Sequence, residues 1–237
     1  MEPGTDAARR ITGYGEKFDR LFEMGARAVR AGTHHRDSPP VDGGRWGVSV
    51  ILPPDRASTA RLAEATSAAM SVAGRHHWPT GSPDAAHVTV RALEAHRTAA
   101  RREDPLVARG AAALRRTAAA CRPVRLDLRG LTLTPSGIMA CAYPVDPAAT
   151  DFAARLAKEL GADGWFEADF NRDIWYATLV HFTGPVADPE ALVDWVARRR
   201  TLDLGRMTTD VAELLRWRFN GRQPVRVSLA TESLGVR

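Results

Sequence analysis

Apolar and polar residues alternate in residues 86–92, and this alternation predicts a short strand with two different faces. Successive side chains of a strand point to opposite sides, so His87, Thr89 and Arg91 fall on one face. Val88 and the other apolar residues fall on the opposite face. The sequence therefore predicts one face that carries chemistry and one that packs in a core.

A second run, residues 180–184, repeats this pattern with His181 and Thr183 on its polar face. The same alternation assigns Tyr176 and Thr178 to the opposite, core-facing side of the strand. Two histidines, each followed two residues later by a hydroxyl side chain, suggest an acid and a base that act on one hydrogen-bonded group.

Helical spacing of apolar residues predicts an amphipathic helix near the N-terminus. It is followed by a loop rich in glycine and proline, and we expect residues 1–45 to form an N-terminal helix and linker. The first ten residues are expected to lack regular structure. The adjacent His34 and His35 are interpreted as solvated loop residues.

From residue 46 onwards the chain runs twice through a strand, a helix, a loop and a motif strand, which indicates two related lobes. The fold class predicted is α+β, bilobal, with two pseudo-symmetric antiparallel-sheet lobes and outer helices around a central cleft. The lobes span about residues 46–122 and 123–237. The other expected elements are helices at 55–74, 104–120, 146–160 and 189–199, and strands at 47–52, 124–134, 138–145, 208–219 and 225–231.

The composition indicates a globular protein: 44% of the 237 residues are hydrophobic and 26% are charged. No apolar run has the length of a membrane span, and the first ten residues do not resemble a secretory signal. Cys121 and Cys141 are too few for a disulfide framework and lack metal-ligand spacing. We therefore expect a cytoplasmic protein, without a membrane partner and acting as a monomer.

The formal net charge is +5 at pH 7, and all but two of the 33 basic residues are arginines spread along the chain. A basic balance favours an anionic partner. Because the arginines are dispersed, the charge permits a phosphate-bearing substrate without indicating where it binds.

The pattern H-x-T also occurs a third time, at His96 and Thr98. This copy follows the first motif strand and leads into a polar run, without apolar alternation. We interpret His96 as a surface residue and retain His87 and His181.

His87-Val88-Thr89-Val90 and His181-Phe182-Thr183-Gly184 resemble the paired H-x-T-x motifs of the 2H phosphoesterase superfamily, in particular its bacterial 2'-5' RNA ligase-like (LigT-like) cyclic phosphodiesterases. The resemblance covers about residues 46–232. Arg91, two residues beyond the first threonine, strengthens it. Gly184 departs from it, because an apolar residue is usual at that place.

The resemblance implies a metal-independent site, without a cofactor, in which His87 and His181 act as general acid and base on one phosphodiester. An unperturbed pKa near 6.5 lets one imidazole be neutral while the other is protonated. Thr89 and Thr183 would bind the phosphate oxygens. Arg91 would add a charged contact to phosphate or lie in solvent.

The implied substrate is a 2',3'-cyclic phosphate or a 2'-5' linkage, in an RNA end or a small cyclic nucleotide. Trp175, which shares the His181 face by parity, and Trp78, in the loop before His87, are candidates for base stacking. Two alternatives remain open: an RNA or nucleotide binding module with the same cleft and weak catalysis, and a scaffold that binds a partner through its N-terminal helix.

Overall fold

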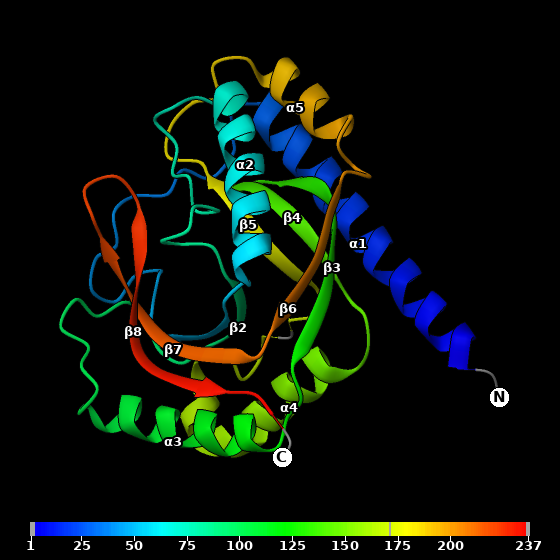
Figure 1. Cartoon of the computed structure of the whole chain (residues 1–237). Helices are drawn as coiled ribbons and strands as arrows, with labels where there is room; N and C mark the ends of the chain where they lie inside the picture. Colours follow the sequence, from blue (N-terminus) through cyan, green and yellow to red (C-terminus); the bar gives the residue numbers. More distant parts are fainter. Residues whose placement is uncertain (1–2, 171, 236–237) are drawn as a thin grey trace.

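The computed structural model describes residues 3–170 and 172–235, whose helices and strands are labelled in Figure 1. In chain order the elements are α1 (Pro3–Arg30), β1 (Ser49–Leu52), α2 (Arg56–Ala73), β2 (Val88–Ala92), α3 (Pro105–Ala119), β3 (Val124–Thr134), β4 (Gly137–Pro144), α4 (Ala148–Leu160), the 3-10 helix η1 (Gly161–Glu167), β5 (Trp175–His181), α5 (Pro189–Ala197), β6 (Asp203–Thr209), β7 (Val211–Phe219) and β8 (Pro224–Ser233).

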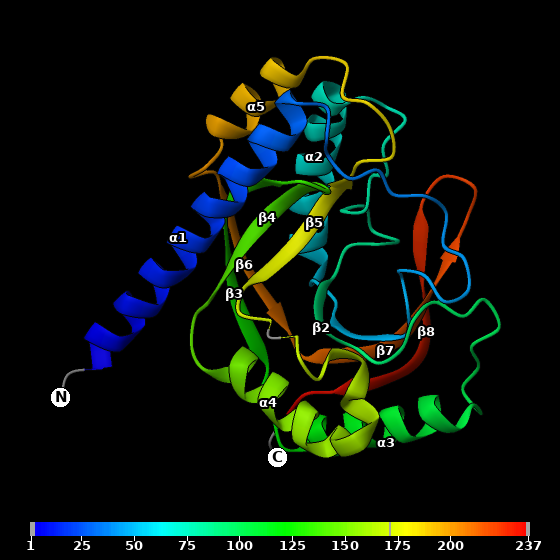
Figure 2. The same ribbon diagram turned by 180° about the vertical axis from the view of Figure 1, so that it is seen from behind.

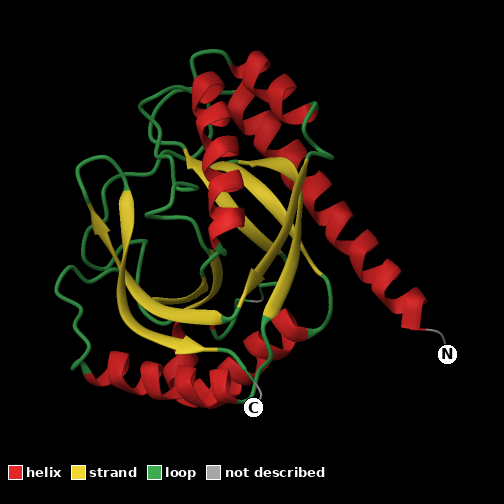
Figure 3. Ribbon diagram, in the orientation of Figure 1, coloured by secondary structure: helices red, strands yellow, loops and turns green. Residues whose placement is uncertain are grey.

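The strands form one antiparallel sheet in the order β6-β3-β4-β5-β2-β1-β7-β8. It is strongly bent, as Figure 3 shows. Its two four-stranded halves join where β2 meets β5, at the pair of Val88 and Ala177. The predicted α+β class with two antiparallel halves is confirmed, and the halves belong to one continuous sheet.

The expected strand 208–219 is instead two strands in different halves of the sheet, so this prediction is wrong. β6 ends at Thr209 and lies at one edge, whereas β7 starts at Val211 and pairs with β1. The Thr209 hydroxyl donates to the carbonyl of Val211 at 2.8 Å across the break. Such a local hydrogen bond gives the backbone an alternative to the hydrogen bonds between neighbouring strands. β7 and β8 thus adjoin β1 and β2.

The helices cover the sheet, as Figures 1 and 2 show from opposite sides. α2 contacts β5 and β6, while α3 packs on α4. The predicted limits of α2 are confirmed: the Asp55 carboxylate accepts from the amide of Ser58 at 2.8 Å and caps the first turn, and Gly74, at φ 116°, ends the helix.

α1 lies across β3 and β4, and its N-terminal part extends beyond the sheet in both views. Its close approach requires Gly25, because a Cβ atom there would lie 2.6 Å from the backbone of Leu133. Phe18, 1% exposed, fills the interface. Burying a side chain of this size stabilises the fold by roughly 1.5–3 kcal/mol.

The expectation that residues 1–10 lack regular structure is wrong for residues 3–10, since α1 begins at Pro3. Residues 1–2 lie outside the described part. Among the described ranges, no helix combines the length and the apolarity that crossing a membrane requires.

Candidate active site

His87, immediately before β2, and Thr89, in β2, line the same cavity. Against β1, Thr89 pairs with Ile51 and Arg91 pairs with Val50, so Val90 is an extra residue. Such a bulge reverses the alternation that follows it. Arg91 consequently points away from the face of Thr89 and donates to the carbonyl of Gly164 at 2.7 Å.

His87 lies immediately before β2, with its ring 4.7 Å from that of Trp217. Its Nδ1 is hydrogen-bonded to the carbonyl of Ala85 at 2.7 Å, so Nδ1 carries the proton and Nε2 is left as acceptor. Burial lowers the pKa of His87 to about 4; the bond to Ala85 opposes this, and the positive charges of Arg226 and Arg172 add to it. A neutral imidazole of this kind can accept a proton at neutral pH.

β5 also contains a bulge. Against β4, Thr178 pairs with Met139 and Val180 with Ile138, which leaves Leu179 as the extra residue. Tyr176 and Thr178 therefore line the same cavity as His87 and Thr89. The assignment of Tyr176 and Thr178 to the core face is wrong, because strict alternation takes no account of the bulge.

The bulge also lets His181 line this cavity. Its Nδ1 shares a hydrogen bond of 2.7 Å with the hydroxyl of Thr80, and its ring lies 4.7 Å from the ring of Trp46. Burial, reinforced by the positive charge of Arg45, lowers the pKa of His181 well below its ordinary value. Both imidazoles thus use Nδ1 within the protein and leave Nε2 for a ligand.

The cavity has a volume of about 170 Å³, and two arginines give it positive charge. Arg172 donates from Nε to Glu167 at 3.1 Å, and a second, very short contact joins the same two side chains. Arg45 donates to Asp37 at 2.8 Å. Both guanidiniums are therefore paired with carboxylates of the protein, and the Arg172 pair is the more buried of the two. The remaining lining residues are Trp46, Gly47, Ser49 and Trp217.

Four of the five predicted phosphate and base contacts lie outside this cavity: Thr183, Arg91, Trp175 and Trp78. Arg91 and Trp175 line a larger neighbouring cavity. The Thr183 hydroxyl donates to the carbonyl of His76 at 2.9 Å. Trp175 is 4% exposed, so it offers little surface to a base. The structure thus brings together His87, Thr89 and His181 from the predicted set.

Trp78 is 4% exposed and packs behind the cavity, where its ring contacts those of Trp46 and Phe219. The aromatic rings that do line the cavity are those of Trp46, Tyr176 and Trp217. Trp46 takes a left-handed backbone conformation, φ 69°, which is rare for such a bulky residue. No sequence pattern predicted that conformation.

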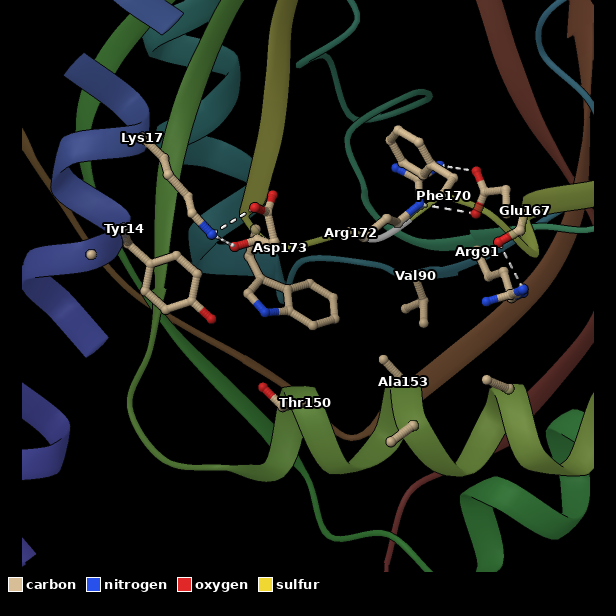
Figure 4. Close-up of a pocket in the computed structure, with 14 residues that line it drawn as sticks. Tyr14, Lys17, Val90, Arg91, Thr150, Ala153, Glu167, Phe170, Arg172 and Asp173 are labelled. Carbon is tan, nitrogen blue, oxygen red and sulfur yellow. Dashed lines mark hydrogen bonds and ion pairs between the residues drawn. The ribbon is translucent and has the colours of Figure 1, made fainter. Parts of the chain in front are cut away.

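A larger cavity of about 550 Å³ opens beside the first, and Arg172 lines both. Figure 4 shows it between α1, which supplies Tyr14 and Lys17, and α4. Lys17 forms an ion pair with Asp173 at 2.6 Å.

Two other histidine interpretations are wrong. His96 is 4% exposed and hydrogen-bonds through Nδ1 to the carbonyl of Trp46 at 2.9 Å, so it supports a cavity residue instead of lying at the surface. His34 is 5% exposed and is hydrogen-bonded to the carbonyl of Gly184 at 2.9 Å. Within the described ranges, no three or more His, Cys, Asp or Glu side chains are grouped so as to hold a metal ion.

No protein-family model matches the chain, and no curated protein matches its sequence. Solved structures do match its fold. TT0787 of Thermus thermophilus superposes with a TM-score of 0.57 at 19% identity, over 80% of this chain and 98% of that one.

A structure described as a phosphoesterase gives a TM-score of 0.53 at 12% identity, over 84% and 100% of the two chains. E. coli LigT in complex with 3'-AMP gives 0.53 at 14% identity, over 80% and 98%. The resemblance stated from the two motifs thus agrees with the fold, and this chain has a LigT-like fold.

Proposed function

We propose that this protein is a phosphoesterase that cleaves a 2',3'-cyclic phosphate or a 2'-5' linkage of RNA or a nucleotide. The observation that carries the proposal is a cavity of about 170 Å³ lined by two imidazoles, His87 and His181, by the Thr89 and Thr178 hydroxyls, and by Arg172. The LigT-like fold supports it, as does the description of LigT structures with 3'-AMP and ATP.

In this proposal the neutral imidazole of His87 takes a proton from a water molecule as the water attacks phosphorus. Thr89 and Thr178 donate hydroxyl hydrogen bonds to the non-bridging oxygens, where negative charge increases in the transition state. Arg172 adds a charge-assisted contact. Thr178 takes the role expected of Thr183, whose hydroxyl is engaged by His76.

The second proton must reach the ribose oxygen that leaves. The resemblance implies that the two histidines are an acid and a base without saying which is which, so with His87 as the base this step would fall to His181. A bound phosphate favours the protonated imidazole, because an opposite charge within a few ångströms raises a histidine pKa. The lowered pKa of His181 in the free protein acts against that role. His181 therefore needs its own test.

The test is hydrolysis of nucleoside 2',3'-cyclic phosphates in the presence of EDTA, with identification of the monophosphate isomer. His87→Ala should lower kcat by roughly 10²–10⁴-fold, as expected for loss of a general base. A similar loss of activity in His181→Ala would support catalysis by two imidazoles. Loss in His87→Ala alone would mean that a group other than His181 protonates the leaving oxygen. Full activity of His87→Ala would overturn the proposed site.

A nucleotide binding module without useful catalysis is the second candidate. It is favoured by the lowered pKa values of both histidines, which leave neither imidazole protonated near neutral pH in the free protein. This candidate predicts saturable binding of 3'-AMP by calorimetry with no product from any cyclic phosphate. It also predicts that His87→Ala leaves the affinity almost unchanged.

A further inference from the structure

β2 and β5 carry the same local arrangement around the point where they meet. In β2, Thr89 precedes the bulge residue Val90, and in β5, Thr178 precedes the bulge residue Leu179. The pair of Val88 with Ala177 lies between them. Residues 87–90, which enter β2, therefore correspond to residues 176–179 of β5 through a local two-fold axis.

This correspondence places Tyr176 where β2 has His87. Continuing the antiparallel register outward from Val88 and Ala177 sets His87 opposite Thr178 and Thr89 opposite Tyr176. All four side chains line the 170 Å³ cavity. Directly opposed Cβ atoms lie about 4.5–5.5 Å apart and diagonal neighbours about 7–8 Å. His87 and Tyr176 thus flank, on a diagonal, the two threonine hydroxyls.

His181 does not belong to this repeat. It follows the β5 bulge, at a position that corresponds to Ala92 in β2. Its backbone is engaged on both sides with Trp78, since the amide donates to the Trp78 carbonyl and the carbonyl accepts from the Trp78 amide, each at 3.0 Å. Its Nδ1 is bound by Thr80. His181 is therefore built into the cavity wall.

We infer that Tyr176 is the second catalytic residue of the site and that its phenol protonates the leaving oxygen. The inference rests on the proposed function and names the group that works opposite His87. An in-line displacement at phosphorus has the attacking and leaving oxygens on opposite sides. Two groups related by a local two-fold axis, with phosphate-binding hydroxyls between them, suit that geometry.

Atoms and protons balance in this step. The oxygen of water forms a bond to phosphorus while Nε2 of His87 takes one of its protons, and the bond from phosphorus to the ribose oxygen breaks. That oxygen takes the phenolic proton of Tyr176. The products are a ribose monophosphate, an imidazolium and a phenolate, and proton transfer from the imidazolium to the phenolate through water restores both residues.

The electrostatics of the cavity agree with this division of roles. The charged and titratable groups that line it with Tyr176 are His87, His181, Arg45 and Arg172. Burial lowers the pKa of both histidines, so at neutral pH both imidazoles are largely unprotonated and neither holds the extra proton that a general acid would donate. The phenol of Tyr176, by contrast, is a neutral side chain that carries its own O–H donor.

The test compares Tyr176→Phe, His181→Gln and His87→Ala on two substrates that differ in leaving group. A nucleoside 2',3'-cyclic phosphate expels a ribose oxygen that needs a proton, whereas a nucleoside p-nitrophenyl phosphodiester expels p-nitrophenolate without one. Tyr143→Phe is the matched control, because Tyr143 packs against Phe18 and not in this cavity.

We expect Tyr176→Phe to lower kcat on the cyclic phosphate roughly 10²-fold or more and to change the p-nitrophenyl reaction less than about threefold. His87→Ala should lose both reactions, while His181→Gln should retain the cyclic reaction within about tenfold. Equal loss of both reactions in Tyr176→Phe would assign it a structural role. Full activity of Tyr176→Phe, with loss in His181→Gln, would overturn the inference in favour of His181.

Failure of the proposed function itself has a different signature, namely no turnover of either substrate by the wild-type protein. Calorimetric titration with inorganic phosphate then decides whether Tyr176 touches the ligand. A Kd at least about fivefold higher in Tyr176→Phe than in Tyr143→Phe would support that contact, since the loss of one hydrogen bond to a charged group weakens binding by at least about that factor. An unchanged Kd would overturn it.

Discussion

Val88 and Ala177 are paired at the junction of the two sheet halves, and the cavity residues that β2 and β5 supply all lie within four positions of one of them. Each strand turns a threonine into the cavity beside this pair and then bulges. The bulges direct Arg91 away from the cavity and His181 towards it. The junction therefore determines which side chains reach a ligand.

Thr178→Val is expected to lower kcat/KM for the cyclic phosphate roughly 10²-fold, because removing one hydroxyl that stabilises transition-state charge has an effect of this order. Thr183→Val is the matched control and should lie within about threefold of wild type, since its hydroxyl is engaged by His76. Steady-state kinetics of both variants measures this. A larger loss of kcat/KM in Thr183→Val than in Thr178→Val would contradict the bulged register and support simple alternation, which places Thr183 at the phosphate.

Most of the fold follows from local patterns in the sequence. The cap at Asp55 and the glycine at Gly74 define α2, and Asn220-Gly221 marks the turn between β7 and β8. These signals act within a few residues. The break at Thr209 and the joining of both halves into one sheet depend on partners far away in the chain, which periodicity does not reveal.

The site was predicted less completely, and the reason is the two bulges. His87, Thr89 and His181 were identified, but alternation without a bulge puts Tyr176 and Thr178 in the core. The available signal was Tyr176-Ala177-Thr178-Leu179, which has the spacing of the first motif with tyrosine in place of histidine. Arg45 and Arg172 come from loops, where sequence patterns give no positions.

Arg172→Gln should raise KM for the cyclic phosphate by about 10–100-fold with a smaller effect on kcat, because a charged hydrogen bond to phosphate contributes about 1.5–3 kcal/mol. Arg109→Gln removes an arginine that pairs with Asp163 outside this cavity, and it should leave KM unchanged. Initial rates over a range of substrate concentrations separate the two parameters. Equal KM values in both variants would exclude Arg172 from the phosphate site.

Stability should fall as the pH falls from about 6.5 towards 4, and His77 should contribute to this change. Burial lowers the pKa of His77 to about 4, with the charges of His76 and His34 adding to the effect and the bond to Ala73 opposing it. Between these pH values the unfolded chain binds a proton at this histidine and the folded protein does not. The free energy of unfolding therefore rises with pH there, by up to about 1.4 kcal/mol per pH unit.

His77→Gln should reduce the slope of the unfolding free energy against pH by up to about 1.4 kcal/mol per pH unit, which is the contribution of one proton. Urea unfolding at several pH values between 4 and 7 measures this slope. In the native protein the amide of Thr183 donates to Nδ1 of His77 at 3.1 Å, and the introduced glutamine side chain keeps an oxygen that can accept this bond. His35→Gln is the control, because His35 is largely exposed. An identical slope in both variants would show that His77 is protonated as readily in the folded protein as in the unfolded chain.

Gly25→Ala should displace α1 from the sheet and destabilise the protein by about 1–3 kcal/mol, the usual effect of an overpacked contact. The added Cβ would lie 2.6 Å from Leu133 and 2.7 Å from Thr134, both backbone atoms that cannot move aside independently. Gly15→Ala is the matched control on the same helix, since no atom lies within 4 Å of its added Cβ. That change should stabilise α1 by about 0.5–1 kcal/mol through helix propensity. Thermal and urea unfolding measure both, and equal effects of the two variants would show that α1 does not depend on this close contact.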